Sequence, residues 1–353
     1  MERSGTTEEE VFFFFLRKGL WGEEEAELAD GLTLIGTQWE ALFGKACSQA
    51  VAGIWIDGVA QTSVRPPEAV WGKWVAFLLF QKRMNLDIGR KVFAWTERLE
   101  RAGVRTFVFK GISVARWYRR PLYRGSGDLD LVVTEGWERL GGVLSGWGMS
   151  WAEAHQDIQT EDGDLLVEFH QDVEFLYNPF MQSRLRRMQA ECAGDKEFYW
   201  VCLILHLRRH CLIYGVGLKQ VCDVAVMLRR SGLDMAKAAR MLRRLRAERF
   251  CRPLFALMEK HLGVADFPVA PSRGRELELL EKTIRDDAYR LMRQREEIGR
   301  GRGRVARAFS NMWFWMKRSI AWFGLMPDEA LCFPPYLAWR RVREGVRAWK
   351  RKK

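Results

Sequence analysis

The spacing of apolar residues along the chain predicts mostly helices, with a β-prone stretch in the middle. Up to about residue 104 the apolar residues recur at helical intervals. Thr6-Thr7-Glu8-Glu9-Glu10 is typical of a helix start, and Pro66-Pro67-Glu68 begins a second, long helix that Gly103 ends. The helical spacing returns at Lys196 and predicts further helices, over 198–212, 218–230, 235–247, 252–262, 276–298, 305–323 and 334–353.

Between these helical regions, β-prone residues predict a small sheet. Two apolar strands are each expected to be followed by a helix: strands Thr106–Phe109 and Leu129–Val133, helices Ile112–Arg119 and Gly136–Leu144. Thr134 is the expected N-cap of the second helix. Two extended runs, 150–160 and 164–170, flank Asp162-Gly163, a dipeptide typical of a hairpin turn. We therefore predict an α+β fold in which a small mixed β-sheet is flanked by N-terminal and C-terminal helical regions.

These patterns divide the chain into four regions. We predict an N-terminal helical region (1–103), a β-containing core (104–195), a C-terminal helical domain (196–298) and a basic Trp/Arg-rich helical tail (299–353). The chain has 353 residues, of which 48% are hydrophobic and 29% charged. This composition indicates a globular protein of two or three domains and excludes a disordered one.

The cysteine pattern and the lack of long apolar runs predict a cytoplasmic protein. There are seven cysteines, an odd number, and no two have the CxxC spacing of a zinc or redox site. Reduced thiols of this kind are typical of the cytosol. The apolar run Val11–Leu16 is short and follows acidic residues, so no signal peptide is expected. No stretch reaches the roughly 18 apolar residues of a transmembrane segment.

The positive charge is concentrated near the end of the sequence. The formal net charge is +12, and residues 300–353 hold 14 Lys and Arg against three acids, 14 − 3 = +11. A basic tail predicts a polyanionic partner, either a nucleic acid or an anionic membrane surface. The alternative is a helical tail with basic solvent-exposed faces. Met312–Phe323 mixes aromatic and basic residues, and we favour docking of this segment on the β-containing core (104–195) because aromatic side chains are usually buried.

Two carboxylates in the second predicted strand indicate a metal site. Asp128 and Asp130 are separated by Leu129, and alternate side chains of a strand point to the same face. Two carboxylates side by side repel each other unless a cation lies between them. A hard divalent ion such as Mg²⁺, with a phosphate as its other ligand, is the cation that this pair favours. Glu168 and His170 likewise share one face of a later strand.

The order of these motifs is similar to that of a known family. Four motifs follow one another: Phe109-Lys110-Gly111, Arg124-Gly125-Ser126-Gly127-Asp128-Leu129-Asp130, Val167-Glu168-Phe169-His170, and a helical region with His206, His210 and Asp223. Together they resemble the uncharacterised nucleotidyltransferase family of the DNA polymerase beta-like nucleotidyltransferase superfamily, over roughly residues 35–265. The superfamily usually has Gly-Ser or Gly-Gly where this chain has Gly111-Ile112, with Ser113 one position later.

The resemblance implies a metal-dependent nucleotidyltransferase that transfers NMP from an NTP to a hydroxyl acceptor on a small molecule, a protein or an RNA. Residues 104–195 would be the catalytic core, with Mg²⁺ or Mn²⁺ as the cofactor. Asp128, Asp130 and Glu168 would be catalytic metal ligands, and His170 would act in proton transfer or orient Glu168. The nucleotide would be bound by Lys110, Gly111, Ser113 and Arg124.

Other interpretations are open. A catalytically degenerate nucleotidyltransferase fold could serve as a binding or scaffold protein, as the missing Gly-Ser would allow. An Asp-x-Asp glycosyltransferase would also hold a nucleotide through a metal, but residues 104–172 are too short for that fold. Arg124 could pair with Asp128 instead of a phosphate. His206 and His210 lie one helical turn apart with no acid near them in the sequence, so we expect core or interface packing.

Overall fold

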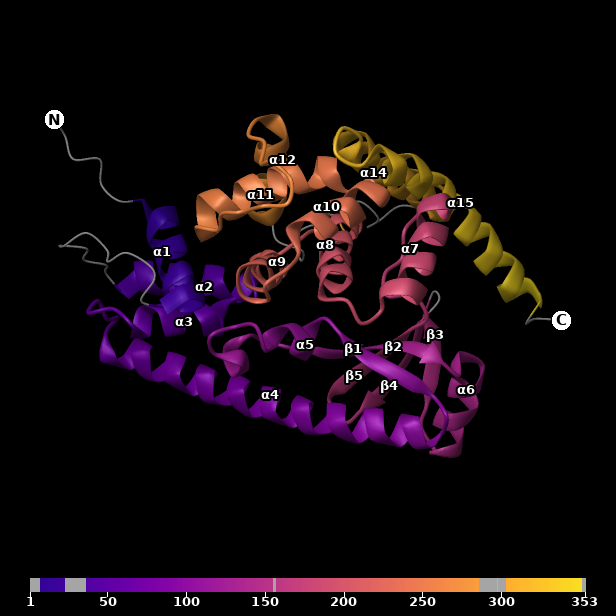
Figure 1. Ribbon diagram of the computed structural model, residues 1–353, viewed down its shortest axis with the longest axis horizontal. Helices are drawn as coiled ribbons and strands as arrows, with labels where there is room; N and C mark the ends of the chain where they lie inside the picture. Colours follow the sequence, from indigo (N-terminus) through magenta and orange to yellow (C-terminus); the bar gives the residue numbers. More distant parts are fainter. Residues whose placement is uncertain (1–6, 23–35, 155–156, 286–296, 298–302, 351–353) are drawn as a thin grey trace. The chain divides into compact units, whose positions relative to one another are not determined.

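The structure is a computed structural model that describes residues 7–22, 36–154, 157–285, 297 and 303–350 (Figure 1). Its chain divides into two compact units. Unit one comprises Met1–Val173, Cys222–Gly232 and His261–Gly263, and unit two comprises Glu174–Val221, Leu233–Lys260 and Val264–Lys353. Unit one contains a five-stranded mixed sheet with helices around it, so the predicted α+β fold is confirmed. The four regions inferred from the sequence stay a prediction.

Unit one begins with three helices: α1 (Glu8–Trp21), α2 (Gly36–Ser48) and α3 (Ala52–Ala60). Helix α1 begins where predicted, because the Glu10 amide donates to the Thr7 hydroxyl and the Thr7 amide donates to the Glu10 carboxylate. This reciprocal capping satisfies amide groups that the first turn of a helix leaves without partners. Phe15, Trp39 and Trp55 form a buried aromatic contact among the three helices.

Helices α1 and α3 cross with their backbones in direct contact. A Cβ atom on Gly58 would lie 1.8 Å from the Phe15 carbonyl oxygen, and one on Gly19 would lie 1.9 Å from the Ile54 carbonyl oxygen. These distances are far below van der Waals contact, so only glycine fits at the crossing. The two glycines therefore determine how closely the helices approach.

The long helix α4 (Glu68–Arg101) leads into the sheet, as the sequence predicts. The strands are β1 (Arg105–Phe109), β2 (Asp128–Glu135), β3 (Trp151–Ala154), β4 (Asp157–Asp162) and β5 (Leu165–His170). Their order is β1-β2-β5-β4-β3, in which β2 and β5 are parallel and all other neighbours are antiparallel. A short helix, α5 (Gly111–Ala115), follows β1, and α6 (Trp137–Gly146) connects β2 to β3.

The two faces of the sheet differ in polarity. On one face, Trp95 and Leu99 of α4 and Leu140 and Leu144 of α6 share a buried core with alternate strand residues (Figure 1), namely Leu129, Leu131, Val133, Val167 and Phe169. Because strand side chains alternate, the residues between these apolar ones point to the opposite face. That opposite face is called the polar face below, and it includes Asp130, Glu168 and His170.

Three local predictions were wrong in detail. The run 150–160 is two antiparallel strands, β3 and β4. The turn between β4 and β5 consists of Gly163 and Asp164, one residue later than predicted, and Gly163 has a φ of 63° that favours glycine. The Thr134 hydroxyl donates to a backbone carbonyl of β1, and Gly136 in the left-handed conformation is the N-cap of α6.

The remaining helices agree with most of the predicted ranges: α7 (Pro179–Cys192), α8 (Lys196–Ile213), α9 (Leu218–Arg230), α10 (Met235–Arg244), α11 (Glu248–Leu262), α12 (Arg275–Arg285), α14 (Arg304–Trp322) and α15 (Pro327–Lys350). Helix α7 was not predicted. Residues 286–296 of the predicted helix 276–298, and 299–302 of the basic linker, lie outside the described residues. None of the described helices is long and apolar enough to cross a membrane. All seven cysteines are free, as predicted.

Helix α8 is buried along most of its length and is the centre of unit two. Trp200 of α8 stacks on Phe255 of α11, and Arg208 forms a buried ion pair with Asp328 of α15. The Arg318 side chain of α14 donates hydrogen bonds to the last carbonyl groups of α8. One side of each C-terminal helix is thereby fixed against α8.

The helix crossing leads to a first prediction. Replacing Gly58 by alanine should destabilise the protein by about 2 kcal/mol, because the added methyl group forces α1 and α3 apart. Gly44 is the matched control, since it lies in α2 with open space around its Cβ position. Gly44→Ala should be neutral or stabilising by up to about 1 kcal/mol. Urea unfolding of both variants measures the difference, and equal midpoints would contradict the crossing.

Candidate functional site

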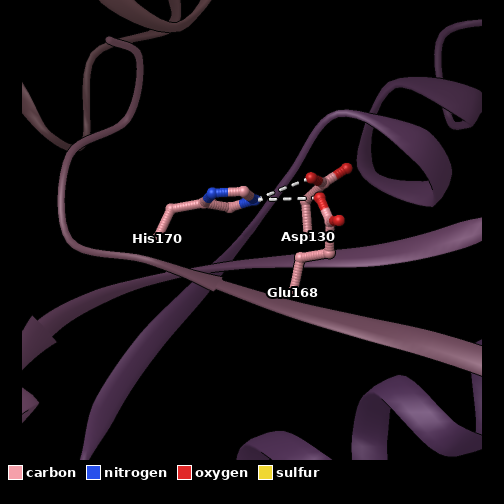
Figure 2. Close-up of side chains that lie close together, drawn as sticks. All are labelled: Asp130, Glu168 and His170. Carbon is pink, nitrogen blue, oxygen red and sulfur yellow. Dashed lines mark hydrogen bonds and ion pairs between the residues drawn. The ribbon is translucent and has the colours of Figure 1, made fainter. Parts of the chain in front are cut away.

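The polar face places five functional groups from three strands in two adjacent rows. In the first row, Asp130 of β2 is level with Glu168 of β5, and Glu168 is level with Gln159 of β4. In the second row, His170 of β5 is level with Asp157 of β4. Figure 2 shows the Asp130, Glu168 and His170 side chains pointing toward one another.

Asp130 is buried, with 4% of its surface exposed, and it is nevertheless ionised. Its Oδ1 atom lies 3.1 Å from the Lys110 Nζ atom and 2.8 Å from the His170 Nε2 atom. Burial alone would raise the pKa of Asp130, but Lys110 and His170 hold it well below its usual range. Because the Asp130 carboxylate is already ionised, it can bind a metal cation without first losing a proton.

His170 is held between two carboxylates. Its Nδ1 atom lies 2.9 Å from Asp157 Oδ1, and its Nε2 atom faces Asp130 (Figure 2). Burial alone would lower the pKa of His170, but the hydrogen bonds to Asp130 and Asp157 raise it to about 9. At neutral pH the ring is therefore an imidazolium that donates from both nitrogens. In this state the ring orients the Asp130 and Asp157 carboxylates, and neither of its nitrogens can accept a proton.

Glu168 has the opposite electrostatic character. Burial raises the pKa of Glu168, and the neighbouring Asp130 carboxylate raises it further. The Gln159 amide donates to Glu168 Oε1, and the His170 Nε2 atom lies 3.8 Å from Glu168 Oε2. The pKa of Glu168 is thus raised, whereas that of Asp130 is lowered.

The turn after β1 positions Lys110 beside Asp130. Lys110 has a φ of 60° with a ψ of −158°, and Gly111 has a φ of 46°, so two successive residues with positive φ reverse the chain before α5. A non-glycine residue in this conformation is strained, so the ion pair with Asp130 helps to hold it. The Ser113 hydroxyl donates to the Lys110 carbonyl oxygen at 2.7 Å, so its proton is used inside the turn.

Arg124 lies in a buried ion pair. The sequence did not decide whether its partner is a phosphate or a carboxylate. Its Nε and Nη2 atoms donate to the two carboxylate oxygens of Asp223 on α9, at 3.0 and 2.6 Å. Tyr118 donates to the same carboxylate at 2.7 Å. Burial alone would lower the pKa of Arg124, but Asp223 raises it, so the buried guanidinium stays charged. Arg124 is thus paired with Asp223 and not with Asp128.

Asp128 is on the polar face at the start of β2, but it is exposed. Its carboxylate does not belong to the cluster of polar side-chain atoms of Asp130, Glu168 and His170, which lie within 4.8 Å of one another. The structure therefore brings three of the four predicted catalytic residues together. The role of Asp128 as a metal ligand stays a prediction, since it lies two residues from Asp130 on the same face.

The donor set fits a hard divalent cation. Asp130, Glu168, Asp157 and Asp128 supply four carboxylates against the two cations Lys110 and His170, 4 − 2 = 2 negative charges in excess. Carboxylate oxygens are the ligands that Mg²⁺ and Mn²⁺ prefer. The imidazolium of His170 has no free lone pair, so the oxygens of Asp130 and Glu168 are the donors available to an ion.

Two residues of the polar face were missed by the sequence reading, Asp157 and Gln159. The β4–β5 hairpin could have revealed them from the sequence. Once the turn is placed at Gly163 and Asp164, counting outward pairs Gln159 with Glu168 and Asp157 with His170.

The two helical histidines also differ from expectation. His206 Nδ1 lies 2.8 Å from the buried Glu174 carboxylate, which also binds Arg209 at 2.8 Å. The sequence shows no acid near these histidines, because Glu174, which packing brings to His206, is 32 residues away in the sequence. His210 packs against the His206 ring, with ring centres 4.1 Å apart.

Comparison with known proteins gives one match. The sequence model of a family described as uncharacterised nucleotidyltransferase matches residues 36–263, which is well over half of the 353 residues. The matched range includes every residue of the polar face. No curated protein and no solved structure matches the chain.

The buried ion pair leads to a second prediction. Asp223→Asn should destabilise the protein by about 3 kcal/mol, because it leaves the Arg124 guanidinium buried without a countercharge. Tyr118→Phe is the matched control, since it removes one hydrogen bond to the same carboxylate and should cost only about 1 kcal/mol. Urea unfolding compares the two variants. Equal losses would show that the charge of Asp223 contributes nothing beyond a hydrogen bond.

Proposed function

Because the chain belongs to the family of uncharacterised nucleotidyltransferases, we propose that it transfers NMP from an NTP to a hydroxyl acceptor in a metal-dependent reaction. The observation that carries the proposal is the convergence of Lys110, Asp130, Glu168 and His170 on one face of the sheet. The acceptor is a hydroxyl of a small molecule, a protein or an RNA. In the reaction its oxygen forms a bond to the α-phosphorus, the bond to pyrophosphate breaks, and the hydroxyl proton is released.

The carboxylates would supply the metal-binding oxygens. Asp130 and Glu168 would hold Mg²⁺ or Mn²⁺, with Asp128 turning in from its exposed position two residues away. When bound, such ions neutralise the phosphates and activate the acceptor oxygen. Asp130 is already ionised, so it needs no proton loss before it binds a cation.

The cationic groups would have separate roles. Lys110 reaches Asp130 from the turn at Gly111, and its charge is placed to contact a phosphate of the nucleotide. His170 would keep Asp130 and Glu168 in position, because its Nε2 atom donates to Asp130 and lies 3.8 Å from Glu168 Oε2. As an imidazolium it carries no lone pair for the acceptor proton. Glu168 has a raised pKa and is therefore the carboxylate best suited to receive that proton.

A second function, a binding or scaffold protein with a degenerate site, is favoured by one observation. The Ser113 hydroxyl, predicted to contact phosphate, donates its proton to the Lys110 carbonyl oxygen. Ile112 also occupies the position at which the superfamily usually has serine or glycine. In that case the polar face would bind a ligand without catalysing a reaction of it.

Nucleotidyl transfer can be tested directly. Wild-type protein incubated with α-labelled NTP, Mg²⁺ and cell extract should give a labelled product, and Asp130→Asn should reduce the rate roughly a hundredfold or more, since it removes a metal-binding charge. Asp164→Asn, in the exposed turn between β4 and β5, is the matched control and should keep full activity. Equal labelling by wild type and Asp130→Asn would contradict the proposal.

Nucleotide binding separates the two functions. Calorimetry should show NTP binding that requires Mg²⁺ and is lost in Asp128→Asn, because the proposed site needs the Asp128 carboxylate, beside those of Asp130 and Glu168, to hold the metal with its phosphate. Lys110→Ala should weaken NTP binding about tenfold, since it removes a charge beside the phosphates. Metal-dependent binding without product formation would favour the degenerate alternative, and binding unchanged by EDTA would contradict a metal site.

A further inference from the structure

The two C-terminal helices have an exposed apolar surface that the proposed nucleotidyl transfer does not use. Five large apolar residues recur along α14 and its last turn at intervals of four, three, four and three residues, and all are exposed: Phe309, Trp313, Met316, Ile320 and Phe323. This spacing puts them on one side of the helix over about 21 Å. Helix α15 adds Leu331, Trp339 and Val342, also exposed. We call these eight residues the tail surface.

The opposite side of the same helices makes the contacts that hold them in unit two. Trp315 and Trp322 of α14 are buried, and Trp315 packs on Phe333 of α15 with ring centres 5.4 Å apart. The Arg341 Nη1 atom donates to a carbonyl oxygen near the start of α14. The aromatic residues of this segment therefore fall into two sets. One set packs inside unit two, and the tail surface is left outside.

The charges around the tail surface have one sign. Among residues 303–343, the only acids are Asp328 and Glu329, and both are buried. Asp328 pairs with Arg208, and Glu329 accepts a hydrogen bond from the Tyr177 amide at 2.6 Å. The exposed charged side chains of this range are all basic: Arg307, Lys317, Arg341 and Arg343. The two acids of residues 303–343 are thus buried inside unit two, and the exposed charged side chains of this range are positive.

Basic and aromatic side chains of the tail surface lie next to each other. The Lys317 Nζ atom is 5.4 Å from the centre of the Trp313 ring, and the Arg343 guanidinium is 5.2 Å from that of Trp339. Tryptophan beside lysine or arginine is typical of residues at the boundary between lipid headgroups and acyl chains. There the ring enters the apolar layer and the cation stays among the headgroup phosphates.

We propose that the tail surface binds the surface of an anionic lipid bilayer, with α14 and α15 lying along it and their apolar residues inserted below the headgroups. No helix in the described part of the chain can span the bilayer, so the contact is peripheral. The net positive charge of this segment selects anionic headgroups. A second copy of the chain is disfavoured as the occupant, because two surfaces of equal charge repel each other.

A nucleic acid fits the tail surface less well. Single-stranded nucleic acids bind by stacking bases on aromatic rings. Half of the tail surface is aliphatic or thioether, namely Met316, Ile320, Leu331 and Val342, and these side chains offer no ring for stacking. Insertion into lipid uses all eight residues, so it accounts for the whole surface.

Vesicle flotation of the full-length protein tests the proposal. The protein should float with vesicles of phosphatidylcholine containing roughly 30% phosphatidylglycerol and bind much more weakly to phosphatidylcholine alone. Trp313→Ser with Ile320→Ser, at positions 60% and 66% exposed, should lower the affinity for anionic vesicles about tenfold or more. Lys317→Gln with Arg343→Gln should remove most of the preference for anionic over neutral vesicles.

The long helix α4 supplies matched controls. Leu79→Ser with Phe93→Ser, at positions 62% and 70% exposed, removes as much apolar surface from unit one. Lys82→Gln with Arg83→Gln removes two exposed charges there. Both should leave vesicle binding unchanged, and all variants should unfold at the wild-type temperature because every altered side chain is exposed.

Several results would overturn the proposal. These are no binding to anionic vesicles, equal loss of binding in the α4 variants, or an oligomer in light scattering that Trp313→Ser with Ile320→Ser dissociates. Single-stranded RNA that displaces the protein from vesicles and binds the Trp313→Ser, Ile320→Ser variant as tightly as wild type would also overturn it.

Discussion

The parallel pairing of β2 with β5 is the constraint on which the candidate site depends. It puts Asp130 level with Glu168, although the two residues are far apart in the sequence. The register is determined by the other face of the sheet, where Leu131 and Phe169 are buried against α4 and α6. A shift of one residue would turn the carboxylates into this core and the apolar side chains outward. The hydrophobic core therefore determines the geometry of the polar face.

Burial of charge is compensated throughout unit one. Asp130 stays charged although it is buried, because Lys110 and His170 lie against it. Arg124 likewise stays charged in the interior because it forms an ion pair with Asp223. Removing a partner would leave a charge without solvent or countercharge, which is a large energetic penalty. The polar face differs from the Arg124 pair in one respect, because its carboxylates outnumber its cations. That excess is what makes it suited to a divalent ion.

The same rule shapes the surface of unit two. Asp328 and Glu329 are buried near α8, where Asp328 pairs with Arg208 and Glu329 accepts hydrogen bonds from backbone amides. Acids that stabilise the interior cannot balance the bases on the exterior. The exposed side of α14 and α15 is consequently both apolar and positive, although the rest of the chain is nearly neutral.

The sequence by itself determined the local features of this protein. The alternation of Asp128, Leu129 and Asp130, the Glu168 and His170 pair, and the start of α1 at Thr7 all follow from periodicity and capping over a few residues. Such features depend on neighbours in the chain, so they can be predicted from it.

Only the tertiary structure decided which of these residues meet. Asp157 joins His170 through strand register, Asp223 joins Arg124 across 99 residues, and Glu174 joins His206 across 32. Asp128 and Asp130 are equivalent in the sequence pattern, yet one is exposed and the other buried between two cations. The physical reason is that the partner of a charged side chain is chosen by the surfaces that packing brings together, and sequence spacing carries no record of that choice.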